Sequence, residues 1–250
     1  MYDQITVMAK ELYEKSVALR RDLHRHPETG WLEMRTSAVI AGILTNLGYE
    51  VLTGRQVVDD RARMGLPSDD ARREHAKLVR ESWDTPLTYL TEEMEAGYTG
   101  VIGILRCGQG PVCALRFDID ALGVLEDENT SHRPAREGFA SQCPGVMHAC
   151  GHDGHTAIGL GVAEVLMNLR AQLHGTVKLI FQPAEEGVRG ARAIVSKGHL
   201  DDVDYFVGTH LAPLDGPDDG AVTPATYGSL ATTKYDVLYR GAPAHAGGFP

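Results

Sequence analysis

The stretch at 147–155 constrains this chain most strongly. It reads MHACGHDGH and holds one thiol, three imidazoles and one carboxylate. Thiolate and imidazole groups are the usual ligands of zinc and similar metals, and a carboxylate can bridge or support them. Cys150 and His152 lie two residues apart, which on a helix would direct them to different sides, so we expect a loop that converges on one point. The stretch therefore predicts a metal site.

A simpler interpretation treats the same residues as a polar helix entrance. Asp153 would then be the N-cap of an apolar helix that begins at Gly154. We expect that capping to occur as well, but it requires neither Cys150 nor three histidines, so the metal site is favoured. His148 and His155 are predicted to support the site or the fold rather than to bind the metal.

The net charge of the chain limits the kinds of molecule that it is expected to bind. The chain has 250 residues, a formal net charge of -10 and a pI near 5.5. An acidic surface attracts neither nucleic acid nor an anionic membrane, so a small-molecule partner is expected. No segment is long and apolar enough to span a bilayer, and the polar N-terminus lacks a signal-peptide core, which predicts a cytoplasmic protein.

The order of expected elements is typical of an α/β fold with a mixed sheet flanked by helices. Hydrophobic periodicity predicts helices and strands in alternation, and the strands at 99–106 and 112–117 suit a hairpin around Gly108 and Gly110. The expected helices cover 4–23, 36–47, 154–170 and 191–197, and the remaining strands 49–52, 176–181 and 205–207.

Two segments depart from this rhythm. Residues 55–96 are densely charged and are expected to form a solvated helical insertion away from the chemistry. The character changes again near residue 224, so we expect a catalytic domain over 1–223 and the start of a second domain over 224–250. One strand-like segment at 227–239 has nothing to pair with before Pro250, which suggests a truncated chain.

Polar residues follow three of the expected strands. Asp118 and Asp120 follow the strand at 112–117, Glu185 and Glu186 follow 176–181, and His210 follows 205–207. Because α/β proteins build sites at the ends of strands, Cys150, His152, Glu186 and His210 are predicted to converge. Sulfur, nitrogen and oxygen ligands suit zinc, manganese or cobalt, and several carboxylates allow two metals to share the site.

The adjacent glutamates indicate the reaction. Neighbouring side chains project in different directions, so one of Glu185 and Glu186 can bind metal while the other accepts a proton from an attacking water. That combination suits amide hydrolysis. The alternatives are a charged helix start for the glutamates and a satisfied strand-end histidine for His210.

At these residues the sequence resembles the M20 metallopeptidases and amidohydrolases, in the branch of the auxin-conjugate, hippurate and aminobenzoyl-glutamate hydrolases. The matching segments run through the chain in the family's order, and the insertion at 55–96 with the AHAGG form of the last segment is most similar to the aminobenzoyl-glutamate hydrolases. These segments are RRDLHRHPETGW at 20–31, LRFDIDAL at 115–122, MHACGHDGHTA at 147–157, FQPAEEG at 181–187, GTH at 208–210 and GAPAHAGG at 241–248.

The resemblance implies specific roles. Cys150, His152, Glu186 and His210 match the metal ligands, Glu185 matches the catalytic base, and Asp120 is similar to a supporting carboxylate. His245 matches a lid-domain histidine that stabilises the oxyanion, often across a dimer; on its own it reads as a loop histidine between small residues.

The resemblance also implies the reaction and the architecture. It implies a zinc-peptidase-like catalytic domain followed by an α+β lid or dimerisation domain, two divalent ions (manganese or zinc) and hydrolysis of an N-acyl amino acid. p-Aminobenzoyl-glutamate, split into p-aminobenzoate and glutamate, is the expected substrate, and the expected assembly is a homodimer or a pair with a homologous second subunit. Family members continue through the lid to a last histidine ligand, which this sequence lacks.

Three other functions stay open at this point. The chain could be a dipeptidase or deacylase with the same site and another pocket. It could be an inactive fragment or a metal-binding interaction subunit that retains the ligands. A structural zinc domain would have a closed shell of four ligands without a catalytic glutamate, so Glu185 beside Glu186 argues against it.

Overall fold

A computed structural model describes residues 1–81, 83–211, 222 and 237 of the chain. Within them, one five-stranded sheet has the order β1-β2-β4-β3-β5. β1 and β2 pair antiparallel, as do β2 and β4, whereas β3 runs parallel to both β4 and β5. The strands are β1 (Glu50–Thr53), β2 (Val101–Arg106), β3 (Val112–Asp118), β4 (Thr176–Gln182) and β5 (Tyr205–Gly208).

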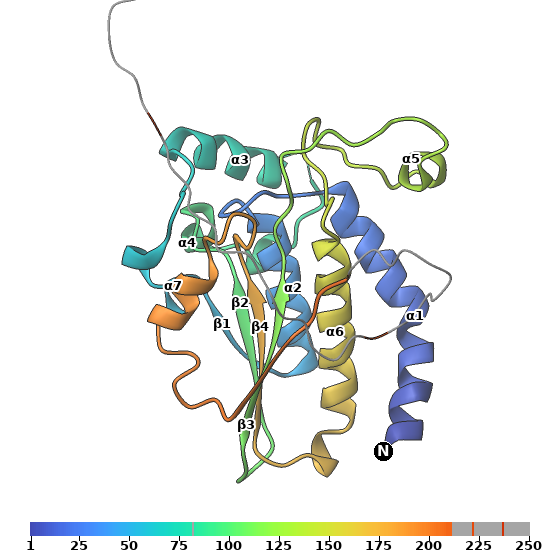
Figure 1. Cartoon of the computed structure of the whole chain (residues 1–250), viewed down its shortest axis with the longest axis vertical. Coiled ribbons are helices and arrows are strands. Elements are labelled where there is room, and N and C mark those ends of the chain that lie inside the picture. The colour runs from blue at the N-terminus through green and yellow to red at the C-terminus, as the bar shows by residue number, and fades with distance from the viewer. Residues whose placement is uncertain (82, 212–221, 223–236, 238–250) are drawn as a thin grey trace, which may run out of the picture. The chain divides into compact units, whose positions relative to one another are not determined.

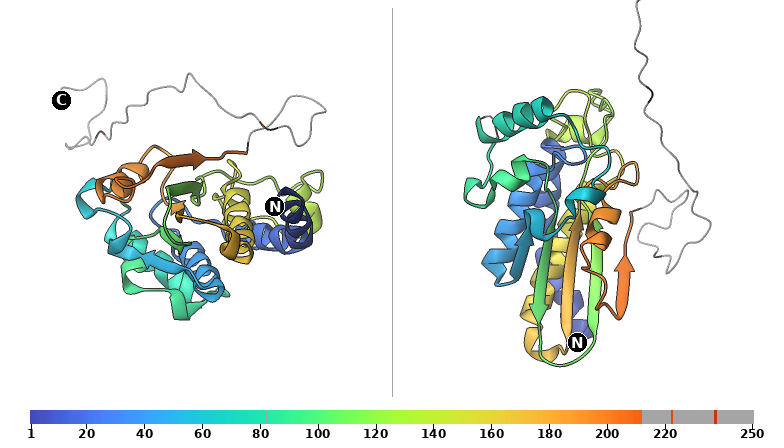
Figure 2. Two further views of the ribbon diagram at one scale, coloured as in Figure 1. Left: turned by 90° about the horizontal axis from the view of Figure 1, so that it is seen from below. Right: turned by 90° about the vertical axis from the view of Figure 1, so that its left-hand side faces the viewer.

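The helices pack on the two faces of this sheet (Figures 1 and 2). Helices α2 and α6 cover one face, and α1 packs against the outside of α6. The α-helices are α1 (Tyr2–Arg25), α2 (Met34–Leu47), α3 (Asp69–Glu81), α4 (Glu92–Glu95), α5 (Arg133–Glu137), α6 (His152–Asn168) and α7 (Ala191–Ser196). Short 3-10 turns occupy Gly54–Gln56, Asp60–Ala62, Leu87–Tyr89 and Arg170–Gln172.

Alternation along the strands divides the apolar residues between two cores. On β4, Leu179 and Phe181 face the cluster formed with α2 and α6, whereas Ile180 belongs to the opposite cluster with Ile102 and Ala193. Both faces are therefore covered, which explains why β4 carries three apolar residues in succession at 179–181.

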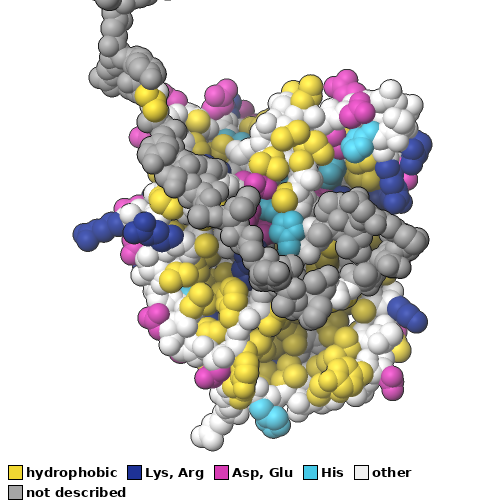
Figure 3. Space-filling model, in the orientation of Figure 1, with side chains coloured by type: hydrophobic (Ala, Val, Ile, Leu, Met, Phe, Trp, Pro, Cys, Tyr) yellow, Lys and Arg dark blue, Asp and Glu magenta, His cyan; other side chains and the backbone are white. Residues whose placement is uncertain are grey.

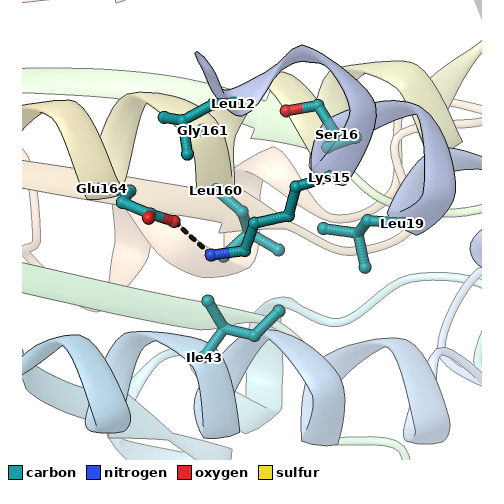
Figure 4. A pocket seen from close by; sticks show the side chains of 9 residues that line it. Leu12, Lys15, Ser16, Leu19, Ile43, Leu160, Gly161 and Glu164 are labelled. Atoms are coloured by element: carbon teal, nitrogen blue, oxygen red, sulfur yellow. Dashed lines mark hydrogen bonds and ion pairs between the residues drawn. The ribbon is translucent and has the colours of Figure 1, made fainter. Parts of the chain in front are cut away.

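Side chains of α1, α2 and α6 meet on the helical face of the sheet. Leu12 and Leu19 of α1, Ile43 of α2 and Leu160 of α6 line a small apolar pocket (Figure 4). Lys15 of α1 forms an ion pair across it with Glu164 of α6. None of the helices in the described part of the chain has the length and apolar character required to cross a membrane.

The sequence-based elements are confirmed with small shifts at their ends, including the termination of α2 at Gly48, which has a left-handed φ of 93°. The predicted hairpin is wrong. β2 and β3 do not pair, because β4 lies between them and hydrogen-bonds to both. The glycine turn at 108–110 thus joins two strands that flank a third, and turn chemistry alone could not reveal the intervening strand.

The insertion also differs from expectation. Although many of its charged side chains are exposed, Val57, Val79 and Met94 are completely buried. Val57 joins one apolar cluster, and Val79 and Met94 join the other. Residues 55–96 therefore help to cover the sheet rather than forming a separate solvated excursion.

The chain divides into two units, 1–213 and 214–250. The boundary expected near residue 224, the strand-like segment at 227–239 and His245 lie outside the described residues. The sheet, its covering helices and the candidate site all belong to the first unit.

Candidate active site

The candidate site lies at the edge of the sheet where the parallel strands end. Asp118 of β3 is in register with Gln182 of β4, and β5 runs parallel to β3 beside it. The carboxyl ends of these strands therefore deliver the segments at 119–120, 183–186 and 209–210 to one place. Figure 3 shows histidine and acidic side chains gathered on one face, next to a patch of hydrophobic side chains.

Two overlapping groups of potential metal ligands meet there. Cys150, His152 and Glu186 form one group, and Asp118, His152, His155 and His210 form the other; within each group the ligand atoms lie within 4.8 Å of one another. The structure thus brings all four sequence-predicted ligands together, with His152 common to both groups. Asp118, which the sequence placed at a strand end without a role, joins them.

His152 is fully buried at the first position of α6. Its Nδ1 atom lies 3.4 Å from Asp120 Oδ1, and its Nε2 atom lies 3.6 Å from Asp118 and 3.8 Å from Glu186. Burial opposes protonation, yet the Asp120 and Asp118 carboxylates prevail and raise the pKa of His152. Several carboxylates around one imidazole create a strongly cation-attracting position.

The buried polar atoms of this cluster fit a cation. His152 Nε2 and Glu186 Oε1 have no hydrogen-bond partner among the described residues. Leaving such a group unpaired costs about 1–3 kcal/mol, and a divalent cation between these atoms would satisfy both. The donor set of imidazole, carboxylate and thiol suits zinc or manganese-type metals.

Cys150 lies between a histidine and a carboxylate of the cluster. Its Sγ atom is 3.4 Å from His210 Nε2. Burial and the Glu186 carboxylate raise the pKa of the Cys150 thiol to about 11. A bound divalent metal reverses this preference because it stabilises the thiolate directly. Metal binding at Cys150 should therefore release a proton.

His155 already uses both of its ring nitrogens. The Leu211 backbone N–H donates to Nε2 at 2.7 Å, so Nδ1 carries the hydrogen and donates to Asp118. Because both nitrogens are used, this geometry agrees with the predicted supporting role of His155, although the residue also lies in the second group of potential metal ligands. Its two hydrogen bonds tie the segment that carries His210 to the end of β3.

Asp120 also has a supporting geometry. Its two oxygens accept the backbone N–H groups of Glu185 and Glu186 at 2.9 and 3.0 Å. The same carboxylate faces His152 Nδ1. The negative charge of Asp120 favours a positive charge on the ring or a cation beside it, and His152 Nε2 faces away from Asp120 toward the cluster.

Glu185 and Glu186 differ modestly in exposure. The Glu185 side chain is 33% exposed and its carboxylate lies 3.9 Å from both His152 Nε2 and an Arg116 nitrogen. Burial raises the pKa of Glu186, which is 21% exposed. Glu185 can therefore reach both the cluster and solvent.

Asp153 does not cap α6 as the sequence suggested. The N-cap is Gly151, with a left-handed φ of 79°, and the helix begins at His152. The Asp153 carboxylate instead accepts hydrogen bonds from Arg20 and His24 at 2.8 Å each. Asp153 therefore bonds to the buried His24 of α1, although the local sequence pattern assigns its side chain to the helix N-cap.

His24 was missed by the sequence analysis. Its second nitrogen lies 2.9 Å from Glu126, so the ring bridges two buried carboxylates. His148, which is close to His24, is buried with neither nitrogen hydrogen-bonded within the described chain, and burial lowers its pKa to about 4. The only signal for His24 was its place in the RRDLHRHPE segment.

The sequence matches the family described as Peptidase family M20/M25/M40 over residues 114–246. It is 48% identical over 242 residues to the indole-3-acetyl-aspartic acid hydrolase of Enterobacter agglomerans, covering 96% of this chain and 55% of the relative. It is 47% identical to one of the subunits of p-aminobenzoyl-glutamate hydrolase from Escherichia coli strain K12, covering 92% and 52%. The chain thus spans about half the length of these curated relatives.

Solved structures show the same fold. The aminobenzoyl-glutamate utilization protein from Klebsiella pneumoniae is 43% identical with a TM-score of 0.70, and the match covers 84% of this chain and 46% of that one. A Bacillus subtilis protein described as a dinuclear metal binding peptidase from the M20 family is 35% identical with a TM-score of 0.59, covering 82% and 44%. The mixed sheet flanked by helices is therefore the M20 arrangement.

Proposed function

Because the chain belongs to peptidase family M20/M25/M40, we propose that it forms the metal-binding part of an enzyme that hydrolyses the amide bond of an N-acyl amino acid. The observation that carries this proposal is the convergence of Cys150, His152 and Glu186 beside the more exposed Glu185. The names of two relatives at nearly equal identity support this reaction class.

Cys150, His152, Glu186 and His210 would hold the metal. A bound divalent metal supplies Lewis acidity, which lowers the pKa of a water molecule and polarises the substrate carbonyl. Two ions, manganese or zinc, are proposed, in line with the B. subtilis structure, which is described as a dinuclear metal binding peptidase. Asp118 is a further candidate ligand, because its carboxylate faces His152.

Glu185 is proposed to act as the general base. It accepts a proton from the attacking water as the water oxygen bonds to the amide carbon, and it then delivers that proton to the leaving nitrogen as the C–N bond breaks. Asp120 holds the Glu185 and Glu186 backbone, and His155 holds the segment of His210. His245 is proposed, from the resemblance alone, to stabilise the oxyanion.

The finer assignments are also proposals. p-Aminobenzoyl-glutamate is the first proposed substrate, supported by the name of the E. coli relative, and indole-3-acetyl-aspartate is the second, supported by the Enterobacter relative. The E. coli relative is named as one part of a multi-subunit hydrolase, which supports a second, different subunit; a homodimer is the alternative. A cytoplasmic location stays a prediction.

Metal stoichiometry tests the site first. The purified chain, supplied with manganese or zinc, should hold about one to two ions by elemental mass spectrometry, because the site offers ligands for two. Cys150→Ala should lose metal, whereas Cys107→Ala, which removes a cysteine outside the cluster, should retain it. Equal metal content in all three proteins would contradict the proposed site.

Substrate assays test the reaction. The metal-loaded protein is incubated with p-aminobenzoyl-glutamate and, separately, with indole-3-acetyl-aspartate, and the released amino acid is measured. Release from one substrate only identifies which of the two conjugates the protein hydrolyses. Metal binding without release from either substrate would favour the alternatives of a different N-acyl substrate or a metal-binding chain without turnover.

A further inference from the structure

The loop between β4 and α7 places Glu185 and Glu186 on an unusual backbone. Ala184, which directly precedes them, has a φ of 48°, in the left-handed region that side chains other than glycine rarely adopt. The residue is completely buried. Such a conformation persists only where the surroundings impose it, and it is often found at functional sites.

The carbonyl groups of Ala184, Glu185 and Glu186 each accept a hydrogen bond from a later residue of the same loop. The Gly190 N–H donates to the Ala184 carbonyl at 2.7 Å, and the Val188 N–H donates to the Glu185 carbonyl at 2.7 Å. Arg189 Nε donates to the Glu186 carbonyl at 2.9 Å. These three carbonyl groups are therefore hydrogen-bonded within the loop itself.

Its N–H groups point instead to two buried carboxyl groups. Glu33 Oε1 accepts the Ala184 N–H at 2.7 Å, and Asp120 accepts the next two. Glu33 is 0% exposed, lies at the N-cap position of α2 and receives a second hydrogen bond from the Thr99 hydroxyl. Three successive amides are thus held by two carboxyl groups from distant parts of the chain.

The packing around Ala184 comes from the same segment as Glu33. A Cβ atom at Gly30 would lie 3.0 Å from the Cα and Cβ atoms of Ala184, so only glycine leaves this close approach unhindered. The close approach of Gly30 and the hydrogen bond to Glu33 together hold Ala184 in its left-handed conformation.

We propose that Glu33 is a positioning residue for Glu185 and Glu186, acting through the backbone of Ala184. Without its acceptor, the Ala184 N–H would be buried and unpaired, and the left-handed conformation would lose its restraint. The two glutamates would then no longer be directed toward His152. This inference rests on the proposed function, in which Glu186 binds the metal and Glu185 is the base.

The protonation of Glu33 fits this role. Burial, together with the charge of Asp120, raises the pKa of Glu33 to about 8, so the carboxyl group is mostly neutral at pH 7. A neutral group beside Asp120 avoids placing two buried negative charges behind the same loop. Glutamine is neutral and similar in shape: its oxygen can accept from Ala184, and its nitrogen can donate to the Thr99 hydroxyl oxygen once that hydroxyl turns from donor to acceptor.

The test compares four proteins: wild type, Glu33→Gln, Glu33→Ala and Glu28→Ala. Glu28 is the matched control, because it is 1% exposed and its carboxylate accepts backbone N–H groups of α2 at Arg35 and Thr36, away from the loop. Each protein is titrated with Co²⁺, following the thiolate-to-cobalt absorption band, and hydrogen exchange is measured over 183–190.

Glu33→Ala should weaken Co²⁺ binding by about 10–100-fold and accelerate exchange over 183–190, because losing a group that supports metal ligands has effects of this size. Glu33→Gln should bind within about threefold of wild type, and Glu28→Ala should retain both the cobalt band and the slow exchange of the loop. If Glu33→Ala does not fold, Glu33→Asp, which shortens the side chain, replaces it.

Unchanged cobalt binding and exchange in Glu33→Ala would overturn the proposal, as would equal losses in Glu28→Ala or in Glu33→Gln. If the wild type itself binds no Co²⁺, the proposed metal site fails. The exchange measurement still decides whether Glu33 holds the loop, so the two failures are distinguishable.

Discussion

Glu185 and Glu186 are neighbours in sequence but face different surroundings, and this difference leads to a prediction at the scale of single residues. Glu185→Gln removes the proposed base while keeping the shape of the side chain. We expect turnover to fall by about 10²–10⁴-fold, the usual contribution of a general base, with metal content unchanged. Steady-state rates and elemental analysis check this, and metal loss as large as in Cys150→Ala would contradict the assignment.

His24 provides a pH-dependent prediction. Burial opposes its charge, but the hydrogen bonds to Asp153 and Glu126 prevail and raise its pKa above the ordinary 6.5. A raised pKa means that the charged ring stabilises the fold fully below about pH 6.5 and that this stability is lost as the pH rises through the higher folded value.

Replacing His24 with leucine removes one partner from each of two buried carboxylates, although Asp153 keeps Arg20 and Glu126 keeps His132. His24→Leu should therefore lower the free energy of unfolding by about 1–3 kcal/mol at pH 6, and by less at pH 9. Urea unfolding with chelator present measures the difference. His174→Leu, at a histidine of the loop before β4, is the control. A penalty for His24→Leu that grew with pH would contradict the charged pairing.

At the scale of elements, two of the three glycines of α6 test its packing against the sheet. A Cβ atom at Gly159 would lie 2.8 Å from the rings of Phe117 and Phe181, whereas one at Gly161 would meet nothing closer than Ser16 Oγ at 3.5 Å. Gly159→Ala should lower the free energy of unfolding by about 1–2 kcal/mol, because overpacking exceeds the gain in helix propensity.

Gly161→Ala should instead raise the free energy of unfolding by up to about 1 kcal/mol, since alanine favours the helix and the space is open. Thermal or urea unfolding of the two single variants gives both signs. Equal effects at the two positions would show that α6 does not approach β3 and β4 as described.

The helices and strands could be predicted from local sequence patterns, but the pairing of the strands could not. The helix and strand ranges follow from hydrophobic periodicity, which is a local property, and they were confirmed within a few residues. The hairpin of 99–106 with 112–117 was wrong because β4, which follows much later in the chain, pairs with both strands. No local signal distinguishes a tight turn from one that leaves room for another strand.

At the scale of the whole molecule, the candidate ligands come from the segment after β5, from the β4–α7 loop and from the start of α6. Metal binding should therefore stabilise the folded chain as a unit, because the unfolded chain lacks this arrangement. At free metal one hundred times the dissociation constant, the gain is about 2.7 kcal/mol, or a rise of about 5–10 °C in Tm.

Differential scanning calorimetry with manganese or zinc, and again with chelator, measures this rise. Cys150→Ala should reduce the shift strongly, and Cys107→Ala should reproduce that of the wild type. An identical Tm with metal and with chelator in the wild type would contradict a preformed site in this chain.

The sequence by itself determined the types of ligand and the elements that carry them. Cys150, His152, Glu186 and His210 could be selected because their chemistry is intrinsic to the side chain and because polar residues at strand ends are visible in a linear pattern. The two glutamates were selected for the same reason, whereas the supporting role of Asp120 was implied by the resemblance to the family.

Only the tertiary structure decided which buried groups hold these residues in place. Glu33 reaches Ala184 across 151 positions and His24 reaches Asp153 across 129, and no local pattern predicts either contact. Asp153 likewise bonds to Arg20 and His24 of α1 and is not the N-cap that the sequence predicted. A buried polar group bonds to whichever partner the packing brings within reach, and packing is a property of the whole chain.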